Sequence, residues 1–128
     1  MKVILDTHAF IWWDSEPEKL SPRARSLCED PQNQLVLSVA SLWEMQIKLQ
    51  LGKLTLSSSL SGIIAAQQEA NELHLLAIQP DHTYALDNLP TLHKDPFDRM
   101  IVAQAITEGL RLISHDDIVR KYPVDVEW

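Results

Sequence analysis

The segment Lys2-Val-Ile-Leu-Asp6 is a short apolar run that ends in a carboxylate. Val3 and Ile4 are β-branched, so the run is typical of a buried strand. An acid placed directly after such a strand costs free energy unless water, a hydrogen-bond partner or a cation stabilises it. The segment therefore predicts a buried strand with a polar site at its carboxyl end, where Asp6 lies.

Similar apolar runs recur along the chain and alternate with helical patterns. Further strands are predicted at residues 35–37, 75–78 and 110–113, with a possible edge strand at 124–128. Helices are predicted at residues 22–29, 39–51, 59–73, 81–86 and 96–108. Ser21 before Pro22 marks one helix start, Asp81 is expected to cap the fourth helix, and Gly52 and Gly109 mark two helix ends. Alternating strands and helices predict one α/β domain over residues 1–128, with a parallel sheet of four to five strands covered by helices on both faces.

The composition is that of a globular domain. Its net charge is negative, which is unusual for a protein that binds nucleic acid. The 128 residues carry a formal net charge of −7, which argues against a broad basic surface for nucleic acid. This argument weakens if several acids gather at a metal site, where cations reverse the local field. The single Cys28 is expected to be a packed side chain in a reducing environment. With no secretion signal or membrane segment visible, we expect a cytoplasmic protein that does not bind membranes.

Four acids, distant in the sequence, are predicted to converge on one edge of the sheet. Asp6 follows the first strand and Asp116 follows the fourth. Glu44 and Asp98 lie near the starts of two helices, and helices that follow parallel strands begin at the carboxyl edge, where ligands bind. Hard carboxylate ligands without a Cys–His grouping favour Mg²⁺ or Mn²⁺.

Three of these acids also have a structural interpretation. Asp98 could simply stabilise the positive end of its helix. Ser41 and Glu44 match the spacing of a capping box. Asp116 could cap a short segment that begins at Ile118. Asp6 is the hardest to explain structurally, because an acid at the end of a buried strand is costly, and the shared edge favours a site for all four.

The chain offers few other functional candidates. Lys48 follows Glu44 by four residues, so it is either an ordinary ion-pair partner or a contact for a substrate phosphate, and Arg99 presents the same choice. Tryptophans at helical spacing, such as Trp12, are more often core or interface residues than base-stacking residues. Glycine occurs only at positions 52, 62 and 109, which excludes a glycine-rich phosphate loop.

Three motifs resemble one known family. They are Leu5-Asp-Thr-His-Ala-Phe-Ile-Trp-Trp13, Ala40-Ser-Leu-Trp-Glu-Met-Gln-Ile-Lys48 and His93-Lys-Asp-Pro-Phe-Asp-Arg-Met-Ile-Val-Ala-Gln-Ala105. In this order, with the ending Leu112-Ile-Ser-His-Asp116, they resemble the PIN-domain family and in particular the VapC-like toxins of bacterial toxin–antitoxin pairs. The likeness runs over the whole chain.

The resemblance implies a three-layer α/β/α fold and a metal-dependent endoribonuclease. The family's four acids fall on Asp6, Glu44, Asp98 and Asp116, although the neighbours Asp95 and Asp117 could replace the last two. One or two Mg²⁺ or Mn²⁺ ions would hold the scissile phosphate and a water, mainly through Asp6 and Asp98, with Asp116 completing the site and Glu44 binding metal or orienting the water. Lys48 and Arg99 would contact phosphate. The resemblance also implies a cognate antitoxin and a homodimer.

Three rival functions fit the sequence less well. A response-regulator receiver needs an acid at the end of its third strand, where this chain has Gln79-Pro80. A phosphatase with Asp6 as nucleophile needs a second Asp two residues later, where this chain has His8. A catalytically silent PIN-like module that binds metal or RNA stays open.

Overall fold

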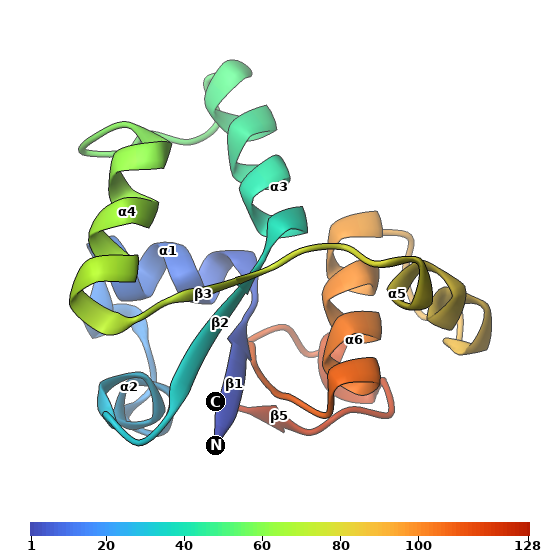
Figure 1. The fold of residues 1–128 in the computed structure, drawn as a ribbon. Helices are drawn as coiled ribbons and strands as arrows, with labels where there is room; N and C mark the ends of the chain where they lie inside the picture. The colour runs from blue at the N-terminus through green and yellow to red at the C-terminus, as the bar shows by residue number, and fades with distance from the viewer.

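The computed structural model describes residues 1–128 as three layers, with a sheet between two sets of helices (Figure 1). The strands are β1 (Lys2–Leu5), β2 (Gln34–Ser38), β3 (His74–Leu76), β4 (Arg111–Ile113) and β5 (Val126–Glu127). They are ordered β3-β2-β1-β4-β5, and every neighbouring pair is parallel. The predicted α/β class, the three layers and the edge position of the last strand are therefore confirmed.

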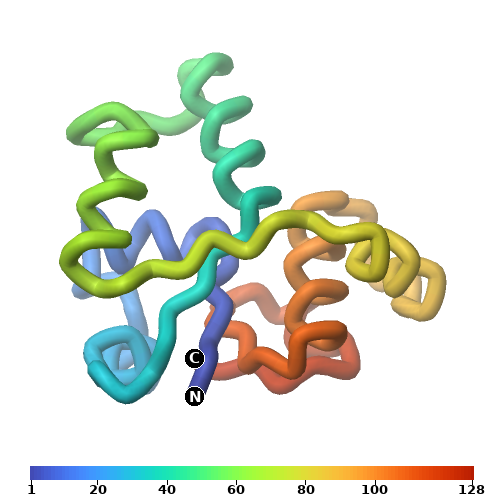
Figure 2. The backbone as a smooth tube through the Cα atoms, viewed as in Figure 1, coloured from blue at the N-terminus to red at the C-terminus, as the bar shows by residue number.

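Six α-helices cover the sheet. They are α1 (Thr7–Ser15), α2 (Pro22–Glu29), α3 (Val39–Gln50), α4 (Leu60–Asn71), α5 (Pro80–Ala85) and α6 (Pro96–Glu108). Three short 3-10 turns complete the chain: η1 (Pro17–Lys19), η2 (Leu86–Asn88) and η3 (Val119–Lys121). In Figure 2 the backbone leaves α4, forms β3 along the sheet edge, and continues into α5, which packs on α6. None of the helices is both long enough and apolar enough to span a bilayer.

Alternate residues of the strands fill two separate cores, which explains why the strands are continuous apolar runs. Val3 and Leu5 of β1 face the core under α1, α2 and α4, while Ile4 between them faces the core under α6. Phe10 and Ile101 are among the largest buried side chains of the two cores. Cys28 is buried in the first core, and burial raises the pKa of its thiol to about 12. It is therefore a packing residue, as predicted.

Most helix ends lie where the sequence places them. Ser21 caps α2 by accepting the N–H of Ala24 at 3.0 Å, and Gly109 ends α6 at a φ of 66°, which a residue without a Cβ adopts freely. The cap of α5 differs from the prediction, because its N-cap is Gln79 and Asp81 lies inside the first turn. Pro80 is the reason: its ring presets the helical φ at the first position, so the helix starts there.

Helix α3 also starts differently from the capping-box interpretation. Its N-cap is Ser38, whose side chain accepts the N–H of Ala40 at 3.0 Å. Ser41 and Glu44 therefore lie within the helix, and both are buried. The capping-box alternative for Glu44 is wrong, which leaves its carboxylate free for contacts outside its own helix start.

Candidate active site

A cavity of about 420 Å³ lies at the carboxyl edge of the sheet, where α1 and α3 begin. It is lined by residues of α1, α3, the start of α6 and the segment after β4. The lining contains five carboxylates and one lysine, together with two histidines, a tryptophan and an alanine: Asp6, His8, Ala9, Trp12, Glu44, Lys48, Asp95, Asp98, His115 and Asp116. The four predicted acids therefore face one cavity.

Asp6 lies at the junction between β1 and α1. Its backbone N–H donates to the carbonyl of Ile113 at 3.1 Å, which extends the pairing of β1 with β4 by one residue. Its Oδ1 accepts the N–H of Ala9 at 2.8 Å, so the carboxylate also caps α1. Burial raises the pKa of Asp6, while hydrogen bonds from Ser114 and Ala9 act to lower it. The carboxylate is therefore fixed in position, and its burial outweighs the contacts that favour its charge.

Glu44 is held from both sides within the cavity. The hydroxyl of Thr7 donates to Glu44 Oε1 at 2.7 Å and lies 3.0 Å from the Oγ of Ser41. On the other oxygen, Lys48 Nζ lies 2.9 Å from Glu44 Oε2. Both carboxylate oxygens of Glu44 thus have a protein partner, and Lys48 is the one lysine that lines the cavity.

Asp95 and Asp98, at the start of α6, have different roles: Asp95 caps the helix, and Asp98 does not. Asp95 is the N-cap, and its Oδ1 accepts the N–H groups of Phe97 and Asp98 at 2.9 and 3.0 Å. Asp98 lies in the first helical turn without a capping role. Burial, followed by the charges of Asp95 and Asp6, raises the pKa of Asp98 to about 7. A carboxyl whose charge is this unfavourable in the metal-free protein is suited to accept a cation.

A series of hydrogen bonds links Asp98 to residues outside the cavity lining. His93 Nε2 lies 3.4 Å from Asp98 Oδ2, and His93 Nδ1 lies 2.7 Å from the hydroxyl of the buried Tyr122. Arg99 donates to the same hydroxyl at 3.1 Å and to the carbonyl of Pro90 at 2.9 Å. Because a buried hydroxyl proton needs an acceptor, Tyr122 donates to Nδ1. The neutral imidazole of His93 then carries its proton on Nε2, which faces the carboxylate.

Asp116 combines a local hydrogen bond with a place in the cavity. Its Oδ1 accepts the N–H of Ile118 at 2.8 Å, so the capping interpretation of this acid holds for one oxygen. Its side chain also lines the cavity, whereas Asp117 does not. The charge of Asp116 acts to raise the pKa of Asp6, which places the two carboxylates in each other's field.

The donor set suits a divalent cation, although the carboxylates do not yet surround one point. Asp98 and Asp116 each use one oxygen in a hydrogen bond with the protein and keep the other for a ligand. No three His, Cys, Asp or Glu side chains lie close enough together to hold an ion as they stand. A bound cation would offset the repulsion between these like charges.

Comparison with known proteins identifies the family. The model of the PIN domain family matches residues 3–124, nearly the whole chain. The chain belongs to the PIN-domain family. At 30% identity over 121 residues, this PIN domain is similar to "Ribonuclease VapC22" of Mycobacterium tuberculosis, with 94% of this chain and 91% of that protein covered.

Solved structures share the fold of this PIN domain at low identity. VapBC2 from Rickettsia felis, bound to a promoter DNA fragment, matches with a TM-score of 0.73 and 17% identity over 99% of this chain and 98% of that one. A toxin–antitoxin complex from Klebsiella pneumoniae matches with a TM-score of 0.64 and 18% identity over 98% and 96% of the two chains.

The structure brings together most, but not all, of the predicted site of the PIN domain. Asp6, Glu44, Asp98, Asp116 and Lys48 line the cavity. Arg99 does not, because its guanidinium is held by Pro90 and Tyr122, so we do not retain it as a phosphate contact.

Neither His93, which was noted only as the start of the third motif, nor Tyr122 was predicted to support the site. His93 lies in the third motif, five residues before Asp98, which was a usable signal. Tyr122 lies far along the chain from both, and only the fold brings its hydroxyl to His93.

Proposed function

We propose that this PIN domain is a Mg²⁺- or Mn²⁺-dependent endoribonuclease that acts as the toxin of a toxin–antitoxin pair. The observation that carries the proposal is the cavity with five carboxylates at the carboxyl edge of the sheet. Its only lysine faces Glu44, so the cavity repels RNA phosphates unless bound cations reverse its charge. The similarity to a protein named as a ribonuclease supports the same reaction.

The residues divide the work of phosphodiester hydrolysis by their contacts. Asp6, Asp98 and Asp116 would hold the ion, with His93 fixing one oxygen of Asp98. When bound, a divalent ion lowers the pKa of a water molecule and neutralises charge on the phosphate. Glu44, anchored by Thr7, would orient that water or contact the ion, and Lys48 can exchange Glu44 for a phosphate oxygen.

Metal removal tests this proposal directly. The purified protein should cut single-stranded RNA with Mg²⁺ or Mn²⁺ and stop when EDTA is added. Cutting that continues undiminished in EDTA would contradict the metal mechanism. RNA that is bound but never cut, under any divalent metal, would support the silent PIN-like module instead.

We also propose an antitoxin as protein partner, together with a homodimer. The two solved structures described above are VapBC2 and a toxin–antitoxin complex. A tail from the antitoxin that carries Arg or Lys would fit the acidic cavity, with apolar side chains near the tryptophans. Trp12 and Trp13 are both partly exposed. Coexpression with a neighbouring small gene should give a complex in which RNA cleavage is blocked, and a tight complex that cleaves at full rate would contradict the blocking.

A further inference from the structure

One side of the acidic cavity is aromatic. His8 and Trp12 lie four residues apart on α1, and His115 follows β4 directly before Asp116. All three side chains line the cavity together with the carboxylates. We call these three residues the aromatic wall. It lies beside Asp6 and Asp116, which precede and follow it in the chain.

Trp12 is at the centre of the aromatic wall. Its ring centroid lies 6.1 Å from that of His8 and 6.4 Å from that of His115. Trp128, which does not line the cavity, lies 5.8 Å from Trp12 and stacks on His115 at 4.9 Å with an interplanar angle of 19°. Trp12 and Trp128 also pack against the core of the α1 face. The wall is therefore held in place before any ligand arrives.

A purely structural cluster would be buried more completely. His8 and His115 are exposed, and Trp12 is only partly buried, although each of these rings carries a large area to remove from water. The wall thus presents aromatic surface to the same cavity that holds the acids.

The cavity has few cationic side chains that could bind the phosphates of RNA. Nucleic-acid binding normally draws its affinity from lysine and arginine contacts to phosphate. Here the cavity has Lys48 as its only lysine and no arginine, and the chain has a net charge of −7. An RNA substrate therefore needs a source of affinity that does not depend on cationic side chains. Stacking of bases on aromatic rings is such a source, and every base has a face that can stack.

We propose that the aromatic wall is a nucleobase subsite. An unpaired base next to the bond that is cut stacks on Trp12, between His8 and His115, while its phosphate lies among the carboxylates and Lys48. The base must be unpaired, because bases inside a duplex are stacked on both faces and cannot reach a side-chain ring without leaving the helix. This inference rests on the proposed ribonuclease function and adds to it how the substrate is held.

The test removes the base from the RNA and the ring from the protein. The probes are short oligouridylate and oligoadenylate, and ribose-phosphate chains of equal length that lack all bases. Binding is measured by fluorescence anisotropy with Ca²⁺ in place of Mg²⁺, and cleavage of the same probes is then followed with Mg²⁺ or Mn²⁺. The variants are Trp12→Leu and, as a matched control, Trp43→Leu, which makes the same change at an exposed position outside the cavity.

The wild-type protein should bind the base-bearing probes about tenfold more tightly than the abasic chain, which is the effect expected of one stacked base. Trp12→Leu should lose this preference and bind both probes as the wild type binds the abasic one. Trp43→Leu should keep it. If Trp12→Leu does not fold, the wild-type comparison of the two probes still decides whether a base is recognised.

Three results would overturn the subsite: equal binding of both probes by the wild type, a preference that persists in Trp12→Leu, or a loss in Trp12→Leu that is equal for both probes. The last result would show that Trp12 acts on the fold or on a protein contact. A base preference that depends on Trp12, without cleavage in any metal, would leave the subsite standing and contradict the ribonuclease function. Cleavage by a wild-type protein that shows no base preference would support the ribonuclease function and contradict the subsite.

Discussion

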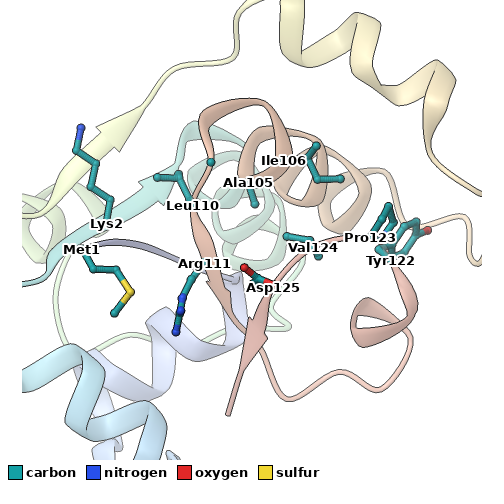
Figure 3. Close-up of a pocket in the computed structure, with 11 residues that line it drawn as sticks. Met1, Lys2, Ala105, Ile106, Leu110, Arg111, Tyr122, Pro123, Val124 and Asp125 are labelled. Atoms are coloured by element: carbon teal, nitrogen blue, oxygen red, sulfur yellow. The ribbon is translucent and has the colours of Figure 1, made fainter.

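Two cavities lie at opposite ends of the same sheet, and they differ in charge far more than in size. The cavity at the amino end has a volume of about 740 Å³. Its lining consists of Met1, Lys2, Arg111 and Asp125, together with residues near the end of α6 and the segment that follows η3 (Figure 3). It contains one carboxylate, one lysine and one arginine. The smaller cavity at the carboxyl end, of about 420 Å³, contains five carboxylates and one lysine.

The difference follows from the direction of the strands. In a parallel sheet every strand ends at the same edge, so the side chains that follow β1 and β4 meet there, as do the first residues of α1 and α3. The amino end, where the same strands begin, receives Lys2 of β1 and Arg111 of β4 instead. The smaller cavity is the candidate site because of the carboxylates that the fold brings to it, and cavity volume alone would favour the other end.

The two cavities are not fully independent, since Tyr122 belongs to both regions. Its ring lines the amino-end cavity, and its hydroxyl bonds His93, which faces Asp98. The difference between the two cavities can therefore be tested by substitutions at three places. These are the carboxylates, the residues that hold them by hydrogen bonds, and the amino end of the sheet.

The largest effect is expected at Asp6. Asp6→Asn should reduce RNA cleavage by more than about a hundredfold, because loss of a ligand should exceed the ten- to hundredfold loss typical of residues that only support one. The metal-free protein should melt at the same or a higher temperature, since burial makes the Asp6 charge unfavourable and Asn caps α1 as well as Asp does. Cleavage rates and thermal melts in EDTA check both parts. A variant that cleaves normally would remove Asp6 from the site.

Asp98 offers a test with a pH dependence. Asp98→Asn should also abolish cleavage while the metal-free fold stays equally or more stable. The pKa of Asp98 rises from 3.8 to about 7 on folding, so between these values the native state binds more protons than the unfolded state. Stability of the metal-free wild type should therefore fall as pH rises through this window.

The stability difference between Asp98→Asn and the wild type isolates this contribution. It should widen in favour of the variant from about pH 4 to about pH 7, which urea unfolding at several pH values in EDTA can measure. A difference that does not change with pH, or marked destabilisation with activity retained, would show that Asp98 only stabilises the start of α6.

A smaller effect is expected at the support of Asp98. Tyr122→Phe removes the hydroxyl that fixes the tautomer of His93, so Asp98 Oδ2 loses a defined donor. Mn²⁺ affinity should weaken by about tenfold, at the low end of the range for such supporting residues. Electron paramagnetic resonance titration with Mn²⁺ measures it. Tyr84→Phe, at a site 68% exposed, is the matched control and should bind Mn²⁺ normally. Unchanged Mn²⁺ binding in Tyr122→Phe would mean that the hydrogen-bond chain only holds the fold.

The strands and most helices could be predicted because their signals are local. Val3 and Ile4 each face a core on one side of a sheet that is buried on both, so the run is apolar without alternation. Ser21-Pro22 and Gly109 mark helix ends through backbone preferences of the residues themselves. The start of α3 at Val39 was predicted correctly, but the capping-box alternative for Glu44 was wrong. Ser38 and Ser41 are both good caps, and only the end of β2 decides between them.

The residues of the candidate site also differ in whether their signals are local in the sequence. The positions of Asp6 and Asp116 could be predicted because Asp6 directly follows β1 and Asp116 lies three residues after the end of β4, so strand direction fixes where they go. The choice between Asp95 and Asp98 could not be made, since it depends on which carboxylate caps α6. Arg99 does not line the cavity for a related reason: its side chain turns to Tyr122, which is distant in the sequence.

The smallest effect is expected at the amino-end cavity, and it is the sharpest test of the comparison. Asp125→Asn and Asp116→Asn make the same chemical change and raise the net charge by the same amount, at opposite ends of the sheet. Any general easing of repulsion between this acidic chain and RNA is therefore equal in the two variants. Asp116→Asn should still lose most of its cleavage, because a candidate ligand is gone.

Asp125→Asn should cleave at the wild-type rate, and its stability should change by no more than about 0.5 kcal/mol, as for most exposed substitutions. Parallel measurements of RNA cleavage and urea unfolding on both variants decide the matter. Equal losses in the two would mean that net charge, rather than the position of the carboxylates, controls the reaction. A loss in Asp125→Asn alone would move the functional site to the amino end. Only a loss confined to Asp116→Asn agrees with a reaction that takes place where the strands end.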